Sequence, residues 1–166
     1  MTKSKILFVG NRRFVLQQIL RMGFDVTGLI VVSGSHLERD LNAGLISWTR
    51  DFHVIHSRAA LIDLIPSFEF DLLIANGCPY ILPITQLPSA RYINVHPSFL
   101  PDLRGADPVI GSILYKRDSG ATCHIMDNGI DSGSIISQVR IPYSDDLDVS
   151  TLYQLSFIAE EQAFCK

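Results

Sequence analysis

Short apolar runs alternate with helical patterns along most of the chain, and this alternation constrains the fold more than any other feature. Lys5–Val9, Val26–Val32 and Asp71–Ala75 have strand length and are apolar almost throughout. Between the first two, Arg13–Met22 has apolar residues at helical spacing and ends before Gly23. Strands that are buried on both faces and separated by helices form mostly parallel sheets. We therefore predict an α/β fold with a Rossmann-like, mostly parallel twisted sheet and helices on both faces.

The rest of the chain continues the same pattern. Asp148 or Ser150 is a candidate N-terminal cap for the last predicted helix, Val149–Phe164. No repeat or interdomain linker interrupts the pattern, and 166 residues suit one domain with a sizeable core. We predict further helices at Leu37–Trp48 (interrupted by Gly44), Ala59–Ile65, Pro108–Tyr115 and Val149–Phe164. We predict further strands at Val54–Ile55, Arg91–His96, Ala121–Met126 and Ile135–Ile141.

Composition and charge narrow the class of protein. The sequence is 47% hydrophobic, which excludes a disordered chain, and its net charge of −3 argues against a general nucleic-acid surface. The apolar runs are far shorter than a membrane span. The basic start enters a strand-like run without a cleavage pattern, so we expect no signal peptide. Three widely spaced cysteines, Cys78, Cys123 and Cys165, favour free thiols. We expect a cytoplasmic protein with no nucleic-acid or membrane partner.

A polar pair ends one of the predicted strands. Asn94 and His96 point the same way if Ile93–His96 is a strand, because successive side chains alternate faces. Pro97 and Pro101 then force an irregular loop, and α/β proteins bind ligands beyond the carboxyl ends of their strands. Histidine exchanges protons near neutral pH, and an asparagine amide can donate to a developing oxyanion. The pair indicates addition to a carbonyl-like carbon; the alternative is two satisfied polar groups at a strand end.

A third candidate catalytic residue lies downstream in the glycine-flanked turn MDNGIDSG. The carboxylate of Asp131 could fix the tautomer of His96 and favour its protonated form. The alternative is a turn carboxylate that accepts from local main-chain N–H groups. On the first interpretation, a nucleophile adds to a carbonyl-like carbon with the help of Asn94, His96 and Asp131, and no covalent bond to the enzyme forms.

The turn after the first strand is a candidate phosphate site. Gly10, Asn11, Arg12 and Arg13 open a helix, and a helix N-terminus with a nearby cation binds phosphate well. The turn lacks the G-x-G-x-x-G dinucleotide fingerprint, so nicotinamide or flavin binding is not expected. The alternative is an ordinary turn with solvated arginines.

Histidines and cysteines show no metal-ligand spacing. His53 and His56 lack the helical i, i+4 spacing, and the adjacent Cys123 and His124 would face opposite sides of a strand. A structural zinc ion needs about four converging ligands. We therefore predict no metal site. Tyr80 lies in a proline-bounded loop and is a candidate site residue, although a buried tyrosine with a satisfied hydroxyl is the alternative.

Three stretches together resemble the catalytic domain of the folate-dependent formyltransferases. They are LLIANGCPYILP, NVHPSFLPDLRGADPV and GATCHIMDNGIDSGSIISQ, in this order between Leu72 and Gln138. The resemblance implies the formyltransferase fold and transfer of a formyl group from 10-formyltetrahydrofolate, as cosubstrate, to an amine. It makes Asn94, His96 and Asp131 the catalytic residues. It also implies that main-chain groups of two loops bind the pterin: Tyr80, Ile81 and Leu82, and Met126, Asp127 and Asn128.

The same resemblance narrows the acceptor. Arg104 with Gly105 resembles the tRNA-directed and sugar-directed branches, whereas His124 resembles the sugar and purine branches. Only the sugar branch fits both, so we expect a nucleotide-linked amino sugar. The resemblance implies that Gly10, Asn11 and Arg12 lie near its phosphates, and that Ser98, Arg104 and His124 lie near the sugar or the site wall.

The resemblance covers most of the chain but stops short of a full family core. We expect residues 1–166 to be a catalytic domain that lacks C-terminal elements, and the family leaves room for a homodimer. Three alternatives stay open: a glycinamide ribonucleotide formyltransferase, a formyltetrahydrofolate hydrolase, and a non-catalytic folate- or nucleotide-binding module.

Overall fold

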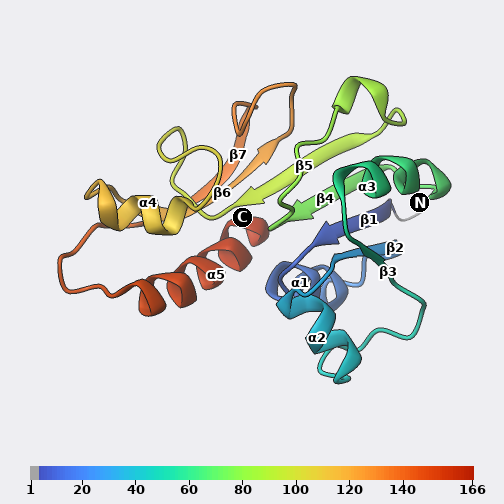
Figure 1. Cartoon of the computed structure of the whole chain (residues 1–166), viewed down its shortest axis with the longest axis horizontal. Coiled ribbons are helices and arrows are strands. Elements are labelled where there is room, and N and C mark those ends of the chain that lie inside the picture. The colour runs from blue at the N-terminus through green and yellow to red at the C-terminus, as the bar shows by residue number, and fades with distance from the viewer. Residues whose placement is uncertain (1–3) are drawn as a thin grey trace. The chain divides into compact units, whose positions relative to one another are not determined.

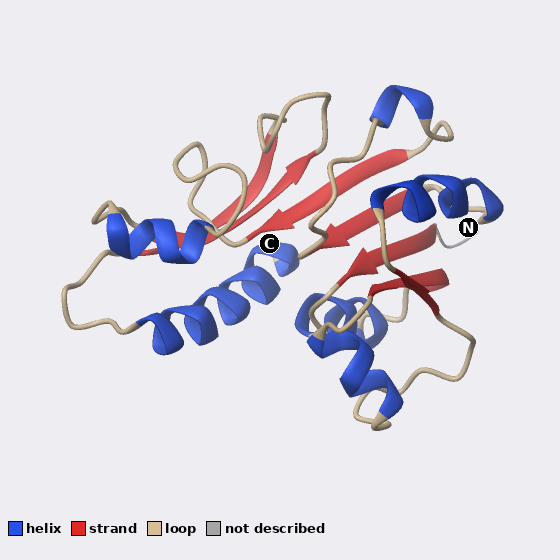
Figure 2. Ribbon diagram, in the orientation of Figure 1, coloured by secondary structure: helices blue, strands red, loops and turns tan. Residues whose placement is uncertain are grey.

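The computed structural model describes residues 4–166 (Figures 1 and 2). The basic start of the chain, on which part of the signal-peptide expectation rests, includes residues 1–3 and so lies partly outside the described residues. The chain divides into two compact units, Met1–Ile93 and Asn94–Lys166. The boundary falls within strand β5 (Arg91–His96), and each unit is described by itself.

The first unit is built on parallel strands. Its strand order is β3-β2-β1-β4, and all three neighbouring pairs are parallel. The strands are β1 (Lys5–Gly10), β2 (Asp25–Val32), β3 (His53–Ile55) and β4 (Leu72–Asn76). The helices are α1 (Phe14–Arg21), α2 (His36–Asn42) and α3 (Arg58–Leu64), with short 3₁₀ turns at η1 (Ile65–Ser67) and η2 (Ile84–Gln86).

Apolar strand residues form the core of this unit. Phe8, Leu29 and Ile74 of the three central strands are fully buried. Helix α1 adds Val15, Leu16 and Ile19, which are also fully buried at helical spacing. The apolar runs of these strands are continuous because, as expected, the strands are buried on both faces.

One predicted helix is wrong in extent. The sequence predicts Leu37–Trp48, but α2 ends at Asn42. Gly44 follows with a φ of +68°, and the N–H of Leu45 donates to the carbonyl of Asp40 at 2.9 Å. A left-handed glycine with such a bond is a common helix ending, so the glycine terminates the helix instead of interrupting it.

The second unit has strand order β5-β6-β7. Strands β6 and β7 pair antiparallel, from Ser119 opposite Ile141 onward. The last helix begins at the predicted cap, where Asp148 accepts from the N–H of Thr151 at 2.8 Å, whereas the alternative cap Ser150 lies inside the helix. The new elements are α4 (Pro108–Leu114), β6 (Ser119–Ile125), β7 (Ile135–Ile141) and α5 (Val149–Cys165).

Helix α5 packs against the hairpin through small residues. Ala159 and Ala163 of the helix are buried against Ala121 of β6, with Val139 and Ile141 of β7 beside them. Within residues 4–166, no helix combines the length and apolar character that a membrane span requires.

Candidate active site

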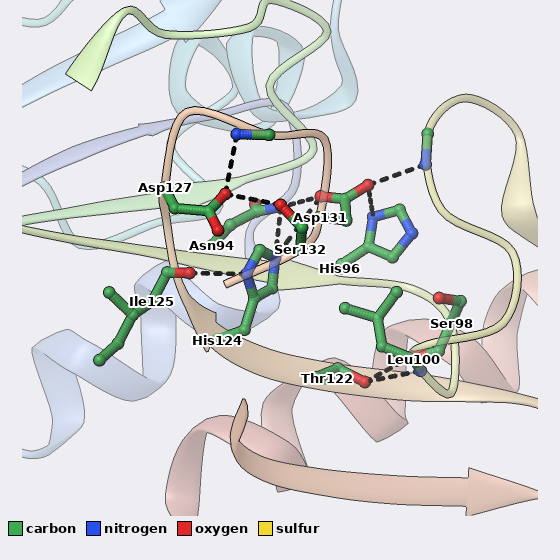
Figure 3. Close-up of polar contacts among 12 residues, drawn as sticks. Asn94, His96, Ser98, Leu100, Thr122, His124, Ile125, Asp127, Asp131 and Ser132 are labelled. Carbon is green, nitrogen blue, oxygen red and sulfur yellow. Dashed lines mark hydrogen bonds and ion pairs between the residues drawn. The ribbon is translucent and has the colours of Figure 1, made fainter. Parts of the chain in front are cut away.

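Strand β5 delivers two polar side chains to one place in the second unit (Figure 3). Asn94 and His96 both contact Asp131, which reaches them from the loop between β6 and β7. The amide Nδ2 of Asn94 donates to Asp131 Oδ1 at 3.2 Å, and His96 Nδ1 lies 3.5 Å from Asp131 Oδ2. The expected alternation along the strand therefore brings both side chains to one carboxylate.

The imidazole of His96 is held between two acceptors. Its Nε2 donates to the main-chain carbonyl of Leu103 at 3.0 Å, and its Nδ1 faces the Asp131 carboxylate. The side chain is only 7% exposed. Because neither partner can donate, a hydrogen on both ring nitrogens suits this position, and the arrangement favours the imidazolium form.

Backbone strain surrounds this imidazole. Asp131 has a φ of +47°, and Leu103 has a φ of +57°. Left-handed conformations are uncommon for residues other than glycine, and they gather at functional sites. Both strained residues contact His96, one through its carboxylate and the other through its carbonyl oxygen.

Opposing effects act on the carboxylate of Asp131. Burial raises its pKa, whereas the contact with His124, the charge of His96 and the N–H of Gly105 lower it. The Gly105 N–H donates to Oδ2 at 2.8 Å. The net result is a pKa below the ordinary value for an aspartate, so Asp131 is ionised at neutral pH.

His124 belongs to the same cluster. Its side chain is 3% exposed, and Nε2 lies 3.3 Å from Asn94 Nδ2 and 3.5 Å from Asp131 Oδ1. Its Nδ1 lies 3.0 Å from the carbonyl of Ile125, which can only accept, so Nδ1 carries a hydrogen. The sequence predicted His124 near the acceptor; the structure brings it against two of the predicted catalytic residues.

Two residues that the sequence interpretation missed hold the loop after β5. The Thr122 hydroxyl donates to the carbonyl of Ser98 at 2.8 Å and accepts from the N–H of Leu100 at 3.1 Å. Gln138 of β7 donates to Thr122 Oγ1 and to the carbonyl of Leu100. A signal was available, because Thr122 and His124 alternate along one strand as Asn94 and His96 do.

Two predicted acceptor-site residues of this loop differ in environment. Ser98 is fully buried, and its hydroxyl donates to the carbonyl of Asp102 at 3.0 Å. The hydroxyl therefore closes the loop after β5, and the place of Ser98 near the sugar or the site wall stays a prediction. Arg104 is exposed next to Gly105, whose N–H binds Asp131.

The β6–β7 loop contains the second predicted pterin segment, Met126, Asp127 and Asn128. Asp127 Oδ1 accepts from the Ser132 hydroxyl at 2.7 Å and from the Gly129 N–H at 2.9 Å. The hydrogen bond from Ser132, followed by that from Gly129, lowers the pKa of Asp127. These bonds give the loop a defined conformation around the turn that ends at Asp131.

The first predicted pterin segment lies in the first unit, and its carbonyls are already engaged. The carbonyl of Tyr80 accepts from Cys78, that of Ile81 from the Arg58 side chain at 2.8 Å, and that of Leu82 from the Ile84 N–H. Within residues 4–166, the N–H groups of residues 80–82 donate to no acceptor. This loop therefore offers main-chain N–H donors to a ligand.

The turn after β1 is held by main-chain bonds of the first unit. The N–H of Asn11 donates to the carbonyl of Asn76 at 3.1 Å, and its carbonyl accepts from the N–H of Leu37. The side chains of Asn11 and Arg12 pack over Gly77, where an added Cβ would lie 1.8 Å from Asn11 Oδ1. Gly10 is the last residue of β1.

Arg13 has partners of its own. Its guanidinium lies 3.4 Å from Asp40 Oδ2 and over the ring of Phe14. Among the residues described, no group of three or more His, Cys, Asp or Glu side chains is arranged to hold a metal ion.

The chain is similar to known proteins in both sequence and fold. A family model described as formyl transferase matches residues 49–166. Methionyl-tRNA formyltransferase from Listeria innocua serovar 6a is 37% identical over 168 residues, covering 90% of this chain and 53% of that protein. Phosphoribosylglycinamide formyltransferase from Streptococcus pneumoniae TIGR4 is 26% identical with a TM-score of 0.74, covering 97% of this chain and 94% of that one. A 4-N formyltransferase from Francisella tularensis is 26% identical with a TM-score of 0.76, covering 97% and 66%.

The two solved structures share the fold along nearly the whole chain, which confirms the predicted α/β class. The family model covers more than half of the residues, and the chain therefore belongs to the formyl transferase family, as its three motif stretches predicted. The chain spans about half the length of the curated relatives that it matches.

Proposed function

We propose that this chain carries the catalytic site for transfer of a formyl group from 10-formyltetrahydrofolate to a primary amine. The observation that supports this proposal most is the convergence of Asn94 and His96 on the ionised Asp131. An amide donor, an imidazolium and a carboxylate in one buried cluster suit a reaction that passes through a tetrahedral oxyanion.

The reaction needs no covalent bond to the protein. The amine nitrogen attacks the formyl carbon, and the carbonyl electrons move to oxygen, where Asn94 and His96 stabilise the negative charge. The intermediate then collapses, its carbon–N10 bond breaks, and the proton lost by the amine ends on N10 of tetrahydrofolate. Asp131 orients His96 and favours its charged form, because the lowered pKa of Asp131 keeps the carboxylate ionised at neutral pH.

The donor site is proposed to use main-chain groups. The unengaged N–H groups of residues 80–82 suit a pterin, whose edge offers both acceptors and donors. The defined turn at Met126–Asn128 offers further main-chain groups. Recognition of this kind explains why Ile81 and Leu82 can be apolar without loss of the site.

We propose a nucleotide-linked amino sugar as acceptor, because Arg104 and His124 together match the sugar-directed branch. The turn at Gly10–Arg12 would receive the phosphates. A second candidate is the amine of methionyl-tRNA, which the 37% identity to a methionyl-tRNA formyltransferase favours. A third is the glycinamide ribonucleotide acceptor, given the similarity to a phosphoribosylglycinamide formyltransferase.

A direct assay compares these acceptors. The protein is incubated with 10-formyltetrahydrofolate and either a panel of nucleotide-linked amino sugars, glycinamide ribonucleotide or methionyl-tRNA, and the formylated product is identified by mass spectrometry. We expect an amino sugar to be formylated. Formylation of only one of the other two acceptors would replace the sugar proposal, and free formate without an acceptor would favour hydrolysis. Binding of 5-formyltetrahydrofolate with no turnover of any acceptor would favour a binding module.

Thermal protection by a nucleotide diphosphate tests the phosphate site separately. The ligand should raise the melting temperature by an amount set by its concentration relative to its dissociation constant, and added salt should weaken the effect because the contacts are ionic. Arg12→Ala should also weaken it. Arg13→Ala is the matched comparison, because it removes the neighbouring guanidinium, which lies against Asp40. Equal protection of wild type and Arg12→Ala would place the phosphates elsewhere.

A further inference from the structure

The loop after β5, residues 97–105, makes two of the contacts that hold the proposed catalytic residues. The main-chain carbonyl of Leu103 accepts from His96 Nε2 at 3.0 Å, and the N–H of Gly105 donates to Asp131 Oδ2 at 2.8 Å. Both contacts use main-chain atoms of the loop, so their geometry depends on the path of its backbone. Any group that fixes this path therefore helps to place the imidazole of His96 and the carboxylate of Asp131.

The backbone of the loop includes a conformation that needs support. Leu103 has a φ of +57°, and a left-handed backbone is unfavourable for leucine, so it persists only where the surrounding structure holds it. Inside the loop, the Ser98 hydroxyl donates to the carbonyl of Asp102 at 3.0 Å. Further hydrogen bonds reach the loop from strands β6 and β7.

Gln138 of β7 supplies part of this outside support. Its Nε2 donates to the carbonyl of Leu100 at 2.7 Å and to Thr122 Oγ1 at 3.0 Å. A carbonyl can only accept, so Gln138 presents its NH₂ group, and not its amide oxygen, to Leu100. The Thr122 hydroxyl donates its one hydrogen to the carbonyl of Ser98 and accepts from the N–H of Leu100, which leaves a lone pair for Gln138 (Figure 3).

We propose that Gln138 is a positioning residue for formyl transfer and acts on His96 and Asp131 through the loop. Its amide ties the loop at Leu100, between the strand that carries His96 and the two main-chain groups that contact the catalytic residues. Gln138 is not proposed to touch the substrate. The kinetic consequence rests on the proposed function, whereas the anchoring of the loop does not depend on it.

Gln138 suits a substitution test because of its place in the sheet. Strand β7 is the last in the strand order, and Gln138 is partly buried, whereas Thr122 is fully buried. Methionine has a similar length but no N–H group, so Gln138→Met removes the donor with little change in shape. Gln162→Met, at an exposed position of α5 in the same unit, is the matched control.

Amide hydrogen exchange tests the anchoring without any turnover. We expect Gln138→Met to speed exchange of the Leu100 and Gly105 N–H groups by about tenfold, the factor that corresponds to loss of roughly one hydrogen bond. The N–H of Ala159, inside α5, should change much less, because general destabilisation is not the cause. Gln162→Met should leave exchange at Leu100 and Gly105 as in the wild type.

The ring signal of His96 reports whether the effect reaches the catalytic residues. The Nε2–H proton is hydrogen-bonded to the carbonyl of Leu103, and a longer bond moves its magnetic resonance signal upfield. We expect this upfield shift in folded Gln138→Met and not in Gln162→Met. Partial unfolding alone would not move the signal of the folded protein, so the shift separates positioning from a purely structural role.

Two results would overturn the inference. One is equal acceleration of exchange at Leu100, Gly105 and Ala159. The other is faster exchange at Leu100 alone, with Gly105 and the His96 signal unchanged, since the anchor would then not reach the site. If Gln138→Met does not fold, Gln138→Asn gives the same measurements, because it keeps an amide but shortens the side chain by one methylene group.

Turnover gives a further readout. We expect folded Gln138→Met to lower kcat by about tenfold, because small misplacements of catalytic groups are costly. The KM for the folate donor should change by less than about twofold, since the residues predicted to bind the donor lie outside the loop. Wild-type kcat in the folded variant would contradict the inference. If the wild-type protein transfers no formyl group to any acceptor, the proposed function fails, and the exchange and ring signals still decide whether Gln138 positions His96 and Asp131.

Discussion

The two polar strand ends of this protein are built in different ways. At the end of β1, Asn11 is fixed through its main chain, and its side chain packs over Gly77. At the end of β5, Asn94 and His96 are fixed through their side chains, which converge on Asp131. The first construction offers a rigid turn with a permanent cation nearby. The second joins titratable groups into one network, so it can move protons. The difference agrees with the proposed phosphate binding in the first unit and the proposed chemistry in the second.

The largest expected effect comes from breaking the side-chain network. His96→Ala and Asn94→Ala should each lower turnover by at least about a hundredfold, because acid–base and oxyanion contributions are each typically of that size. The measurement is kcat under saturating donor and acceptor. His56→Ala is the control for loss of a histidine outside the cluster. Wild-type-like turnover in both variants, with an active parent protein, would rule out the proposed mechanism.

The next effect concerns the support of that network. Thr122→Val removes a buried hydroxyl that serves Ser98, Leu100 and Gln138, and should lower the free energy of unfolding by roughly 2 kcal/mol because buried polar partners lose their bonds. Urea unfolding measures the loss. Thr122→Ser keeps the hydroxyl and should lose clearly less. Equal losses in the two variants would show that the methyl group, and not the hydroxyl, supports the loop.

A smaller effect separates packing from backbone conformation in the first unit. Gly77 and Gly34 have φ angles of +70° and +72°. An added Cβ at Gly77 would meet the side chains of Asn11 and Arg12, whereas one at Gly34 would meet nothing within 4 Å. Gly34→Ala should cost about 1 kcal/mol for the left-handed conformation alone. Gly77→Ala should cost roughly 1 kcal/mol more, since it must also displace the side chains of Asn11 and Arg12. Indistinguishable unfolding free energies would mean that these two side chains move aside at no cost.

The smallest expected effect is the contribution of Asp131 to stability in acid, because burial opposes the contacts that lower its pKa. A carboxylate with a lowered folded-state pKa stabilises the protein fully above the ordinary value near 4, and this stabilisation is lost as the pH falls through the folded-state pKa. The unfolding free energies of wild type and Asp131→Asn should therefore converge toward low pH. Asp63→Asn, at an exposed position of α3, is the control. A difference that is constant with pH would contradict the predicted shift.

The strands were predictable because burial on both faces leaves a continuous apolar run. The bounds of β5 were predicted to the residue, and α5 differs from its prediction by one residue at its end. The extent of α2 was not predictable from apolar spacing alone, since the apolar residues after Gly44 continue a helical pattern that the glycine conformation ends. Local periodicity thus predicts elements better than their ends.

The candidate site was predictable only where side chains, and not main-chain atoms, make its contacts. Asn94 and His96 follow from strand alternation, and Asp131 was a candidate by its residue type. The contacts of Leu103 and Gly105 use main-chain atoms, which leave no mark in the amino-acid sequence. The approach of His124 to Asn94 depends on how β5 and β6 are aligned, and one sequence does not specify that register.

A ligand oxygen that binds the Nε2–H of His96 must displace the main-chain carbonyl of Leu103. It already accepts the Nε2–H of His96 at 3.0 Å. A neutral formyl oxygen that takes its place exchanges one carbonyl acceptor for another and gains little. A negatively charged tetrahedral oxygen forms a charge-assisted bond, which is roughly twice as strong. In the proposed mechanism, the Leu103 carbonyl therefore weakens binding of the substrate's formyl oxygen but leaves the preference for the charged transition state unchanged. Such a preference would raise kcat instead of only lowering KM.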